Sequence, residues 1–179
     1  MYERIFISYH RQDSDNKDEL VELLEENNYD VRSIDEDHIF DGRKHQEIAQ
    51  ICIDEIEDCD VTICIIGKET YSRSHVDHEI KATLRGGFDA RKGLIAIMLE
   101  ERGDSKNNID LNTFPNRIQD NISEDFDYVV LEQWASIQEK IDEAIDEAQY
   151  RRTEHINVKN NRTLMVLRQG RYYNQPFNS

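Results

Sequence analysis

Short runs of apolar residues recur along this chain, separated by longer and more polar stretches. Residues 4–9, Val61–Ile66 and 94–99 are almost continuously apolar, and 128–131 is a shorter run of the same kind. In 30–34, Val31 and Ile34 are the apolar positions, and we expect them to point inward from a further strand. Uninterrupted apolar runs of this length are typical of strands that are covered on both faces of a sheet. These five ranges are therefore predicted to be β-strands.

Four other stretches carry apolar residues at helical spacing, and they lie between or after the strands. The first predicted helix begins at Ser14 or Asp15, and the second carries an apolar stripe over 48–59. The third spans about 75–85, and the fourth begins at Ser136. Gly86 follows the third helix and is typical of a C-terminal stop. In the last helix, Ser136 can form a capping box with Glu139. Between 100 and 127 the chain is polar, and a short helix after Pro115 is the one element suggested there.

The alternation of strands and helices predicts the α/β class. We expect a flavodoxin-like, doubly wound, five-stranded parallel sheet of strand order 2-1-3-4-5. Residues 1–150 are predicted to form this one domain.

Residues 151–179 form a C-terminal extension of opposite charge. Its single acid is Glu154, and its basic residues are Arg151, Arg152, Lys159, Arg162, Arg168 and Arg171. We expect the extension to pack on the acidic domain or on a partner subunit, with Leu164, Val166 and Leu167 inward, as a short extra strand. A loose, solvated tail is the alternative.

Composition excludes several classes of protein. The net charge is −16, with 38 acidic and 22 basic residues, which argues against a nucleic-acid-binding surface. The sequence has no signal-peptide pattern at its start and no apolar run long enough to cross a bilayer, so no membrane contact is expected. The three cysteines lie in apolar patterns, which favours reduced, buried thiols and a cytoplasmic location.

Several familiar sites are also excluded. No glycine-rich phosphate loop follows any predicted strand, which argues against an NTPase or a standard dinucleotide-binding fold. The third strand ends at Gly67, where a phosphoacceptor domain would need an aspartate. The acidic loop 35–42 lacks calcium-binding spacing, because Phe40 stands where glycine is needed and Gln46 where the last glutamate belongs. No metal site is predicted.

Glu79 is the strongest candidate for chemistry. In a doubly wound sheet, ligands bind beyond the carboxyl ends of the strands, and the helix that contains Glu79 begins at that edge. Glu79 lies three residues after Val76 and four before Thr83, so it flanks the buried side of the helix. A carboxylate in an early turn is also stabilised by the helix dipole, so spacing alone leaves a purely structural role open.

Several segments together resemble the bacterial TIR-like domain family, including the TIR component of Thoeris anti-phage defence. They are Ile5-Phe-Ile-Ser-Tyr9 with Asp13, the loop glycine Gly42, Cys59-Asp-Val-Thr-Ile, and His75-Val-Asp-His-Glu-Ile. The resemblance covers residues 4–99 well. Enzymes of that family cleave NAD between ribose and nicotinamide, and they form ADP-ribose or a cyclic or modified ADP-ribose messenger. Their catalytic glutamate corresponds to Glu79, and the family's frequent tryptophan four residues earlier is replaced here by His75.

The resemblance implies an NAD glycohydrolase or ADP-ribose cyclase, with NAD as substrate and no resident cofactor. It also implies self-association, and a downstream effector reached through a nucleotide messenger. We expect Glu79 to line a cleft beside Ser8, His10 and residues 67–75. The candidate NAD-contacting residues are Phe6, Ser8, His10, Arg11, Arg43, Lys68, Ser74 and His75. Among them Arg11, Arg43 and Lys68 are candidate donors to the diphosphate, while Phe6 equally fits the core. The alternative is a non-catalytic TIR-like interaction module.

Overall fold

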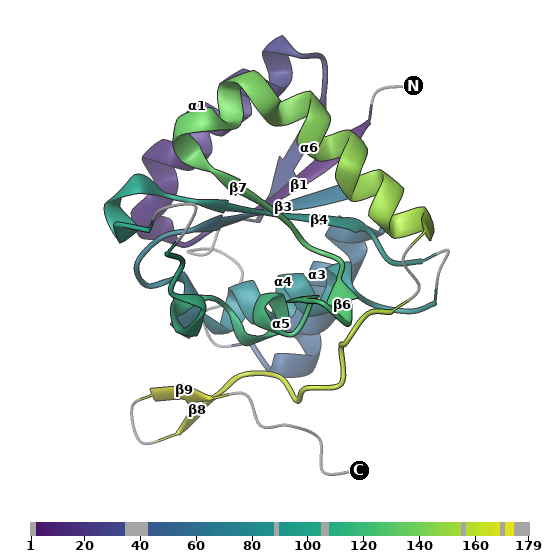
Figure 1. Ribbon diagram of the computed structural model, residues 1–179. Helices are drawn as coiled ribbons and strands as arrows, with labels where there is room; N and C mark the ends of the chain where they lie inside the picture. The colour runs from purple at the N-terminus through teal and green to yellow at the C-terminus, as the bar shows by residue number, and fades with distance from the viewer. Residues whose placement is uncertain are drawn as a thin grey trace.

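The computed structural model describes residues 3–34, 43–87, 90–104, 108–154, 157–168 and 171–173. Five parallel strands form one sheet in the order β2-β1-β3-β4-β7, which confirms the predicted class and strand order (Figure 1). The strands are β1 (Arg4–Ser8), β2 (Asp30–Ser33), β3 (Val61–Ile66), β4 (Gly93–Met98) and β7 (Val130–Gln133).

Helices cover both faces of this sheet. One layer contains α1 (Ser14–Glu26) and α6 (Trp134–Glu154). The other contains α3 (His45–Glu57), α4 (Ser74–Thr83) and the short α5 (Asn116–Gln119), as Figure 1 shows. α5 confirms the short helix predicted after Pro115. No helix within the described ranges is both long and apolar enough to cross a membrane.

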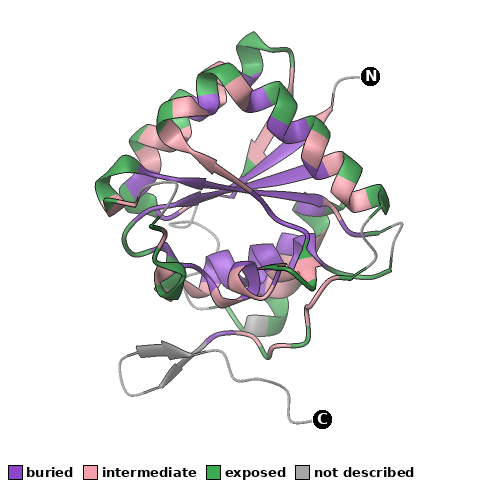
Figure 2. Cartoon of the chain, viewed as in Figure 1, coloured by how far each residue is buried: buried purple, intermediate pink, exposed green. Residues whose placement is uncertain are grey.

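The alternation of side chains along β1 explains how the two layers are filled. Ile5 and Ile7 pack toward α1 and α6, whereas Phe6 packs with α3 residues such as Cys52 on the opposite face. Ser8 shares the face of Phe6, because side chains two residues apart point the same way. Figure 2 shows the resulting buried central strands between helices whose outer surfaces are exposed. The residue that ends β1 is thus directed toward the layer that contains α4.

The last helix begins earlier than predicted. α6 starts at Trp134, directly after β7, with no intervening loop. The Ser136 hydroxyl donates to the carbonyl of Gln133 at 3.2 Å, so this residue lies inside the first turn. The predicted helix start at Ser136, with its capping box to Glu139, is therefore wrong. α6 continues to Glu154, four residues past the predicted domain boundary.

The stretch 100–127 has more structure than its polar sequence indicated. Besides α5 it contains the 3-10 turns η3 (Glu100–Arg102) and η4 (Leu111–Thr113), and a small antiparallel pair, β5 (Ile122–Ser123) and β6 (Phe126–Asp127). Ile118 and Phe114 are buried against the α4 side of the sheet. This stretch therefore belongs to the second helical layer.

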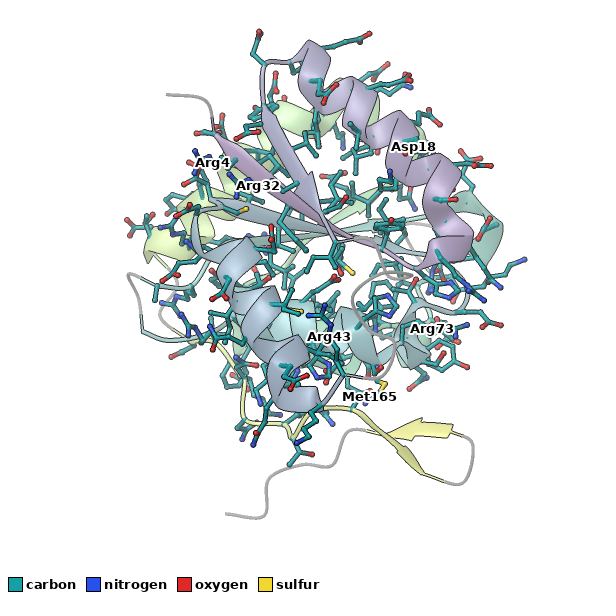
Figure 3. All side chains as sticks on the ribbon, turned by 180° about the vertical axis from the view of Figure 1, so that it is seen from behind. Arg4, Asp18, Arg32, Arg43, Arg73 and Met165 are labelled. Carbon is teal, nitrogen blue, oxygen red and sulfur yellow. The ribbon has the colours of Figure 1, made fainter. Side chains whose placement is uncertain are left out.

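The C-terminal extension passes across α4 and α5 on the side away from the sheet (Figure 1). We call residues 157–165 the strap. The side chain of Asn121 makes two hydrogen bonds to the strap backbone. Its amide donates to the carbonyl of Lys159 and its oxygen accepts the Lys159 N–H, each at 2.8 Å. Met165 is 2% exposed, and Figure 3 shows it where the strap passes below the helices.

Beyond the strap, β8 (Val166–Arg168) and β9 (Arg171–Tyr173) pair antiparallel with each other. Leu164 is half-buried and lines a cavity. The side chains of Val166 and Leu167, which were predicted to point inward, lie outside the described part of the structure.

A buried ion pair joins α4, α5 and the strap. The guanidinium of Arg117 is fully buried and donates to the Asp77 carboxylate at 2.7 Å. It also donates to the carbonyls of Arg162 and Thr163, at 2.9 and 3.0 Å. Asp77 accepts the backbone N–H of Met165 at 2.8 Å. Both charges are therefore removed from water and satisfied by hydrogen bonds, which is the condition under which a buried pair is tolerated.

Gly67, which ends β3, is in close contact with a carboxylate. A methyl group at this residue would lie 2.4 Å from an oxygen of Asp13, whose side chain is buried. The Gly67 N–H is already fixed by a hydrogen bond to the Thr70 hydroxyl at 2.9 Å, so the backbone has little freedom to move away.

We therefore expect Gly67→Ala to lower the free energy of unfolding by about 1–3 kcal/mol, the usual cost of overpacking. Urea unfolding followed by circular dichroism measures this difference. Gly87→Ala is the matched control, because a methyl group there meets no atom within 4 Å. Equal stability of the two variants would contradict the tight contact.

Candidate active site

The side chains of Ser8 and Glu79 meet at the carboxyl edge of the sheet. β1 ends at Ser8 and α4 begins at Ser74, so the end of the strand faces the first turns of the helix. The Ser8 hydroxyl donates to Glu79 Oε2 at 2.5 Å. Ser8 is fully buried and Glu79 is 2% exposed. A buried carboxylate is thus held in one orientation at the place where this fold binds ligands.

Glu79 is more deeply buried than its helical spacing indicated. That spacing placed it at the flank of the buried side, with partial exposure, whereas every residue from His75 to Ile80 is buried. The reason is that α4 is covered on several sides. The sheet lies behind it, α3 packs beside it, and α5 with the strap covers its outer surface.

Two buried cysteines lie close enough to Glu79 for its charge to affect their pKa. Cys64 is the register partner of Ser8 on β3, and Cys52 is buried on α3. Burial raises the pKa of both thiols well above the ordinary range, and the negative charge of Glu79 raises it further. Both thiols are therefore protonated at neutral pH. Because Glu79 is 2% exposed, water screens its charge little, which strengthens its electrostatic effect on any cation that forms nearby.

His75 ties the start of α4 to the end of β1. Its Nε2 lies 3.0 Å from the carbonyl oxygen of Tyr9, and because a carbonyl only accepts, this nitrogen carries the hydrogen. The His75 ring stacks on His10 with 6.3 Å between centroids and 25° between planes. Both rings are buried. His75 therefore joins the same two elements that the Ser8–Glu79 hydrogen bond joins.

The other candidate residues lie around this centre in different settings. Phe6 is a core residue on the α3 side, with no exposed surface. Arg11 in the 3-10 turn η1 (Arg11–Asp13), Arg43 before α3 and Lys68 after β3 are all exposed, and Figure 3 labels Arg43 near the start of α3. Ser74 is half-buried, and its carbonyl accepts from His78 Nδ1 at 2.6 Å. The loop 35–42, including Gly42, lies outside the described residues.

The side chain of Arg102 also lies at this edge of the sheet, and no sequence pattern predicted it. It donates to the carbonyl of Gly67 at 3.1 Å and to the hydroxyl of Thr113 at 2.6 Å. Its guanidinium also pairs with Asp104 at 2.6 Å and lies over the Phe114 ring. Arg102 thereby fixes the loop after β4 against the end of β3. Arg102 lies in a stretch without hydrophobic periodicity, so its contacts with Gly67 and Thr113 could not be predicted from the sequence.

Comparison with known proteins identifies the family. The family model of the TIR-like domain of Thoeris protein ThsB matches residues 6–104, which is more than half of the chain. The chain belongs to this TIR-like family. The match runs from β1 to just beyond η3, so it includes Ser8, His75 and Glu79, and the TIR-like resemblance inferred from the sequence is confirmed. No match was found among curated proteins.

Membership places the chain with the TIR-like domains of Thoeris anti-phage defence. The described segments from η4 onward lie outside the match, including α5, β7, α6 and the strap. Arg117, which joins α5 to α4 and to the strap, therefore belongs to the part of this chain that the family model does not describe.

Proposed function

We propose that this chain is an NAD-cleaving enzyme of the TIR-like family. It breaks the bond between ribose and nicotinamide, and it forms ADP-ribose or a cyclic or modified ADP-ribose that acts as a messenger in anti-phage defence. The observation that carries the proposal is the buried Glu79 carboxylate, fixed by the Ser8 hydroxyl at 2.5 Å at the carboxyl edge of the sheet. The family match over the same residues supports it.

The chemistry requires one well-placed carboxylate. As the glycosidic C–N bond breaks, its electron pair leaves with nicotinamide and positive charge develops on the ribose. A carboxylate beside the ribose stabilises this oxocarbenium-like state, as carboxylates do in glycosidases. Nicotinamide bound as a pyridinium departs neutral, so no second, protonated acid is needed. Water, or a hydroxyl of the same molecule, then forms the new bond to the ribose carbon and loses its proton.

In this mechanism Ser8 is a positioning residue. Its hydroxyl donates to one carboxylate oxygen and so fixes the plane of the Glu79 side chain. His75 holds the first turn of α4 against the end of β1 through the carbonyl of Tyr9. We assign the exposed cations Arg11 and Lys68, which follow β1 and β3, to the diphosphate of NAD.

The direct test is to incubate the full chain with NAD and to follow nicotinamide release by liquid chromatography, with mass spectrometry of the other product. The measurement is repeated at increasing protein concentration, because catalytic TIR domains often act only when assembled. Release of nicotinamide in amounts that exceed the protein supports an NAD-cleaving enzyme. If assembled protein releases none, the chain acts as a TIR-like interaction module.

Ser8→Ala is expected to lower kcat about 10- to 100-fold with little change in KM, because a carboxylate that is no longer oriented stabilises the transition state less well. The matched control is Ser72→Ala, which removes a hydroxyl that donates only to the carbonyl of Glu69 within its own turn. Wild-type turnover by the Ser8 variant would contradict the positioning role.

A further inference from the structure

Helix α4 is held between the sheet and the strap. On the sheet side, Glu79 accepts from Ser8 on β1 at 2.5 Å, and the hydroxyl of Thr83 donates to that of Thr62 on β3 at 2.8 Å. Glu79 and Thr83 are four residues apart, so they lie on the same face of the helix. These two contacts fix the inner face of α4 to the central strands β1 and β3.

The strap contacts the opposite face of α4 at two residues, Asp77 and Lys81. Asp77 accepts the backbone N–H of Met165 at 2.8 Å. The carbonyl of Lys81 accepts from the side-chain amide of Asn160 at 3.1 Å. Both residues are two positions from Glu79 along the chain, which is about 200° around the helix axis. The strap therefore holds α4 immediately before and immediately after Glu79, from the outer side.

The side chain of Asn160 connects the end of α4 to the buried ion pair. Its amide reaches the last turn of α4, where helix carbonyls have no partner within the helix, so it acts as a cap. Its oxygen accepts from the buried Arg117 at 3.0 Å. Arg117 also donates to Asp77 and to the strap carbonyls of Arg162 and Thr163. Asn160 thus links the strap to α4 and to α5 at once.

The position of α4 determines the position of the Glu79 carboxylate. α4 has ten residues, and an isolated helix of that length is only marginally stable, so its place is set by the groups packed on it. The single hydrogen bond from Ser8 orients the carboxylate, but it acts on the inner face alone. A catalytic group that moves by roughly 1 Å can lose about a hundredfold in rate. Contacts on the outer face of α4 therefore bear directly on the proposed chemistry.

We propose that the strap is a positioning element for Glu79 and that it acts through Asn160. By holding the outer face of α4 on both sides of Glu79, it keeps the carboxylate at the depth at which Ser8 reaches it. This inference rests on the proposed cleavage of NAD. It adds to the site a segment that lies outside the family match, which ends at residue 104.

Asn160→Ala tests this role without removing the buried ion pair, because Arg117 keeps its bonds to Asp77 and to the strap carbonyls. We expect kcat for nicotinamide release to fall about tenfold, with KM within about twofold of the wild-type value, because Glu79 is displaced while the exposed NAD contacts remain. Asn160→Asp should lose as much. It keeps an oxygen for Arg117, but it cannot donate to the Lys81 carbonyl, and its charge is unfavourable at a helix C-terminus.

Hydrogen exchange of backbone amides measures how firmly α4 is held, and it needs no NAD. In both Asn160 variants the amides of residues 79–83 should exchange at least about tenfold faster than in the wild type, because the helix opens more often when its cap is lost. Tyr29→Phe is the matched control. It removes a hydroxyl that donates to Asp142 at 2.9 Å in the other helical layer, and it should change neither kcat nor the exchange of α4.

The two measurements separate this inference from the proposed function. Wild-type kcat in the Asn160 variants, a change in KM alone, or unchanged exchange of α4 would overturn the positioning role, as would an equal loss of kcat in Tyr29→Phe. If the wild-type protein releases no nicotinamide, the proposed function fails. The exchange of α4 then decides by itself whether the strap holds Glu79 in place.

Discussion

Glu79→Gln is expected to lower kcat for NAD cleavage by about a hundredfold or more, the usual loss when a preorganised electrostatic group is removed. Glutamine has nearly the same shape and keeps an oxygen that accepts from Ser8. Only the negative charge that stabilises the ribose cation is lost. Nicotinamide release under single-turnover and steady-state conditions measures the effect on the chemical step directly.

Folding must be controlled in this experiment, because Glu79 is 2% exposed. Burying a neutral amide costs less than burying a carboxylate, so we expect a melting temperature equal to or above that of the wild type. Glu143→Gln, on the exposed side of α6, is the matched control for loss of one negative charge. A Glu79→Gln protein that melts normally and turns over NAD at the wild-type rate would show that Glu79 is not catalytic.

Arg117→Met is expected to lower the free energy of unfolding by about 3–5 kcal/mol, the typical cost of leaving one member of a buried ion pair without the other. The variant leaves the Asp77 carboxylate buried, and it removes the donor for the carbonyls of Arg162 and Thr163. Urea unfolding of the full chain measures this difference.

Two further variants test whether the loss of stability comes from the buried Asp77–Arg117 ion pair. Arg4→Met removes ion pairs with Asp30 and Asp58 in which all three side chains are at least 40% exposed, and it should cost no more than about 1 kcal/mol. Asp77→Leu combined with Arg117→Met removes both charges, so it should be less destabilising than Arg117→Met alone. A double variant as unstable as the sum of its single changes would mean that the two charges do not interact.

The sheet could be predicted because its signal is local. The six apolar residues of Val61–Ile66 need no partner to be recognised as a buried strand. The meeting of Ser8 and Glu79, which are 71 residues apart, also followed from the expected topology, because the ends of parallel strands and the helices that follow them share one edge. The choice of Glu79 among 38 acidic residues came from the resemblance to TIR-like domains, and spacing alone left its role open.

The polar contacts that bury α4 could not be predicted in this way. Arg117 and Asp77 are 40 residues apart, and Met165 lies 88 residues from Asp77. Hydrophobic periodicity carries no information about such pairs, because a charged residue in a polar stretch has the pattern of a surface residue. The deep burial of Glu79 depends on the same contacts. The sequence therefore indicated only that Glu79 flanks the buried side of its helix.

The strap also limits how copies of this chain can approach one another. It occupies the outer surface of α4 and α5, which would otherwise be open to a neighbouring molecule, and Met165 is buried in that contact. A neighbour docking on this side would have to compete with a segment that is covalently attached, and therefore present at a high effective concentration. An assembly that leaves the strap in place cannot use the surface of α4 and α5 that the strap covers.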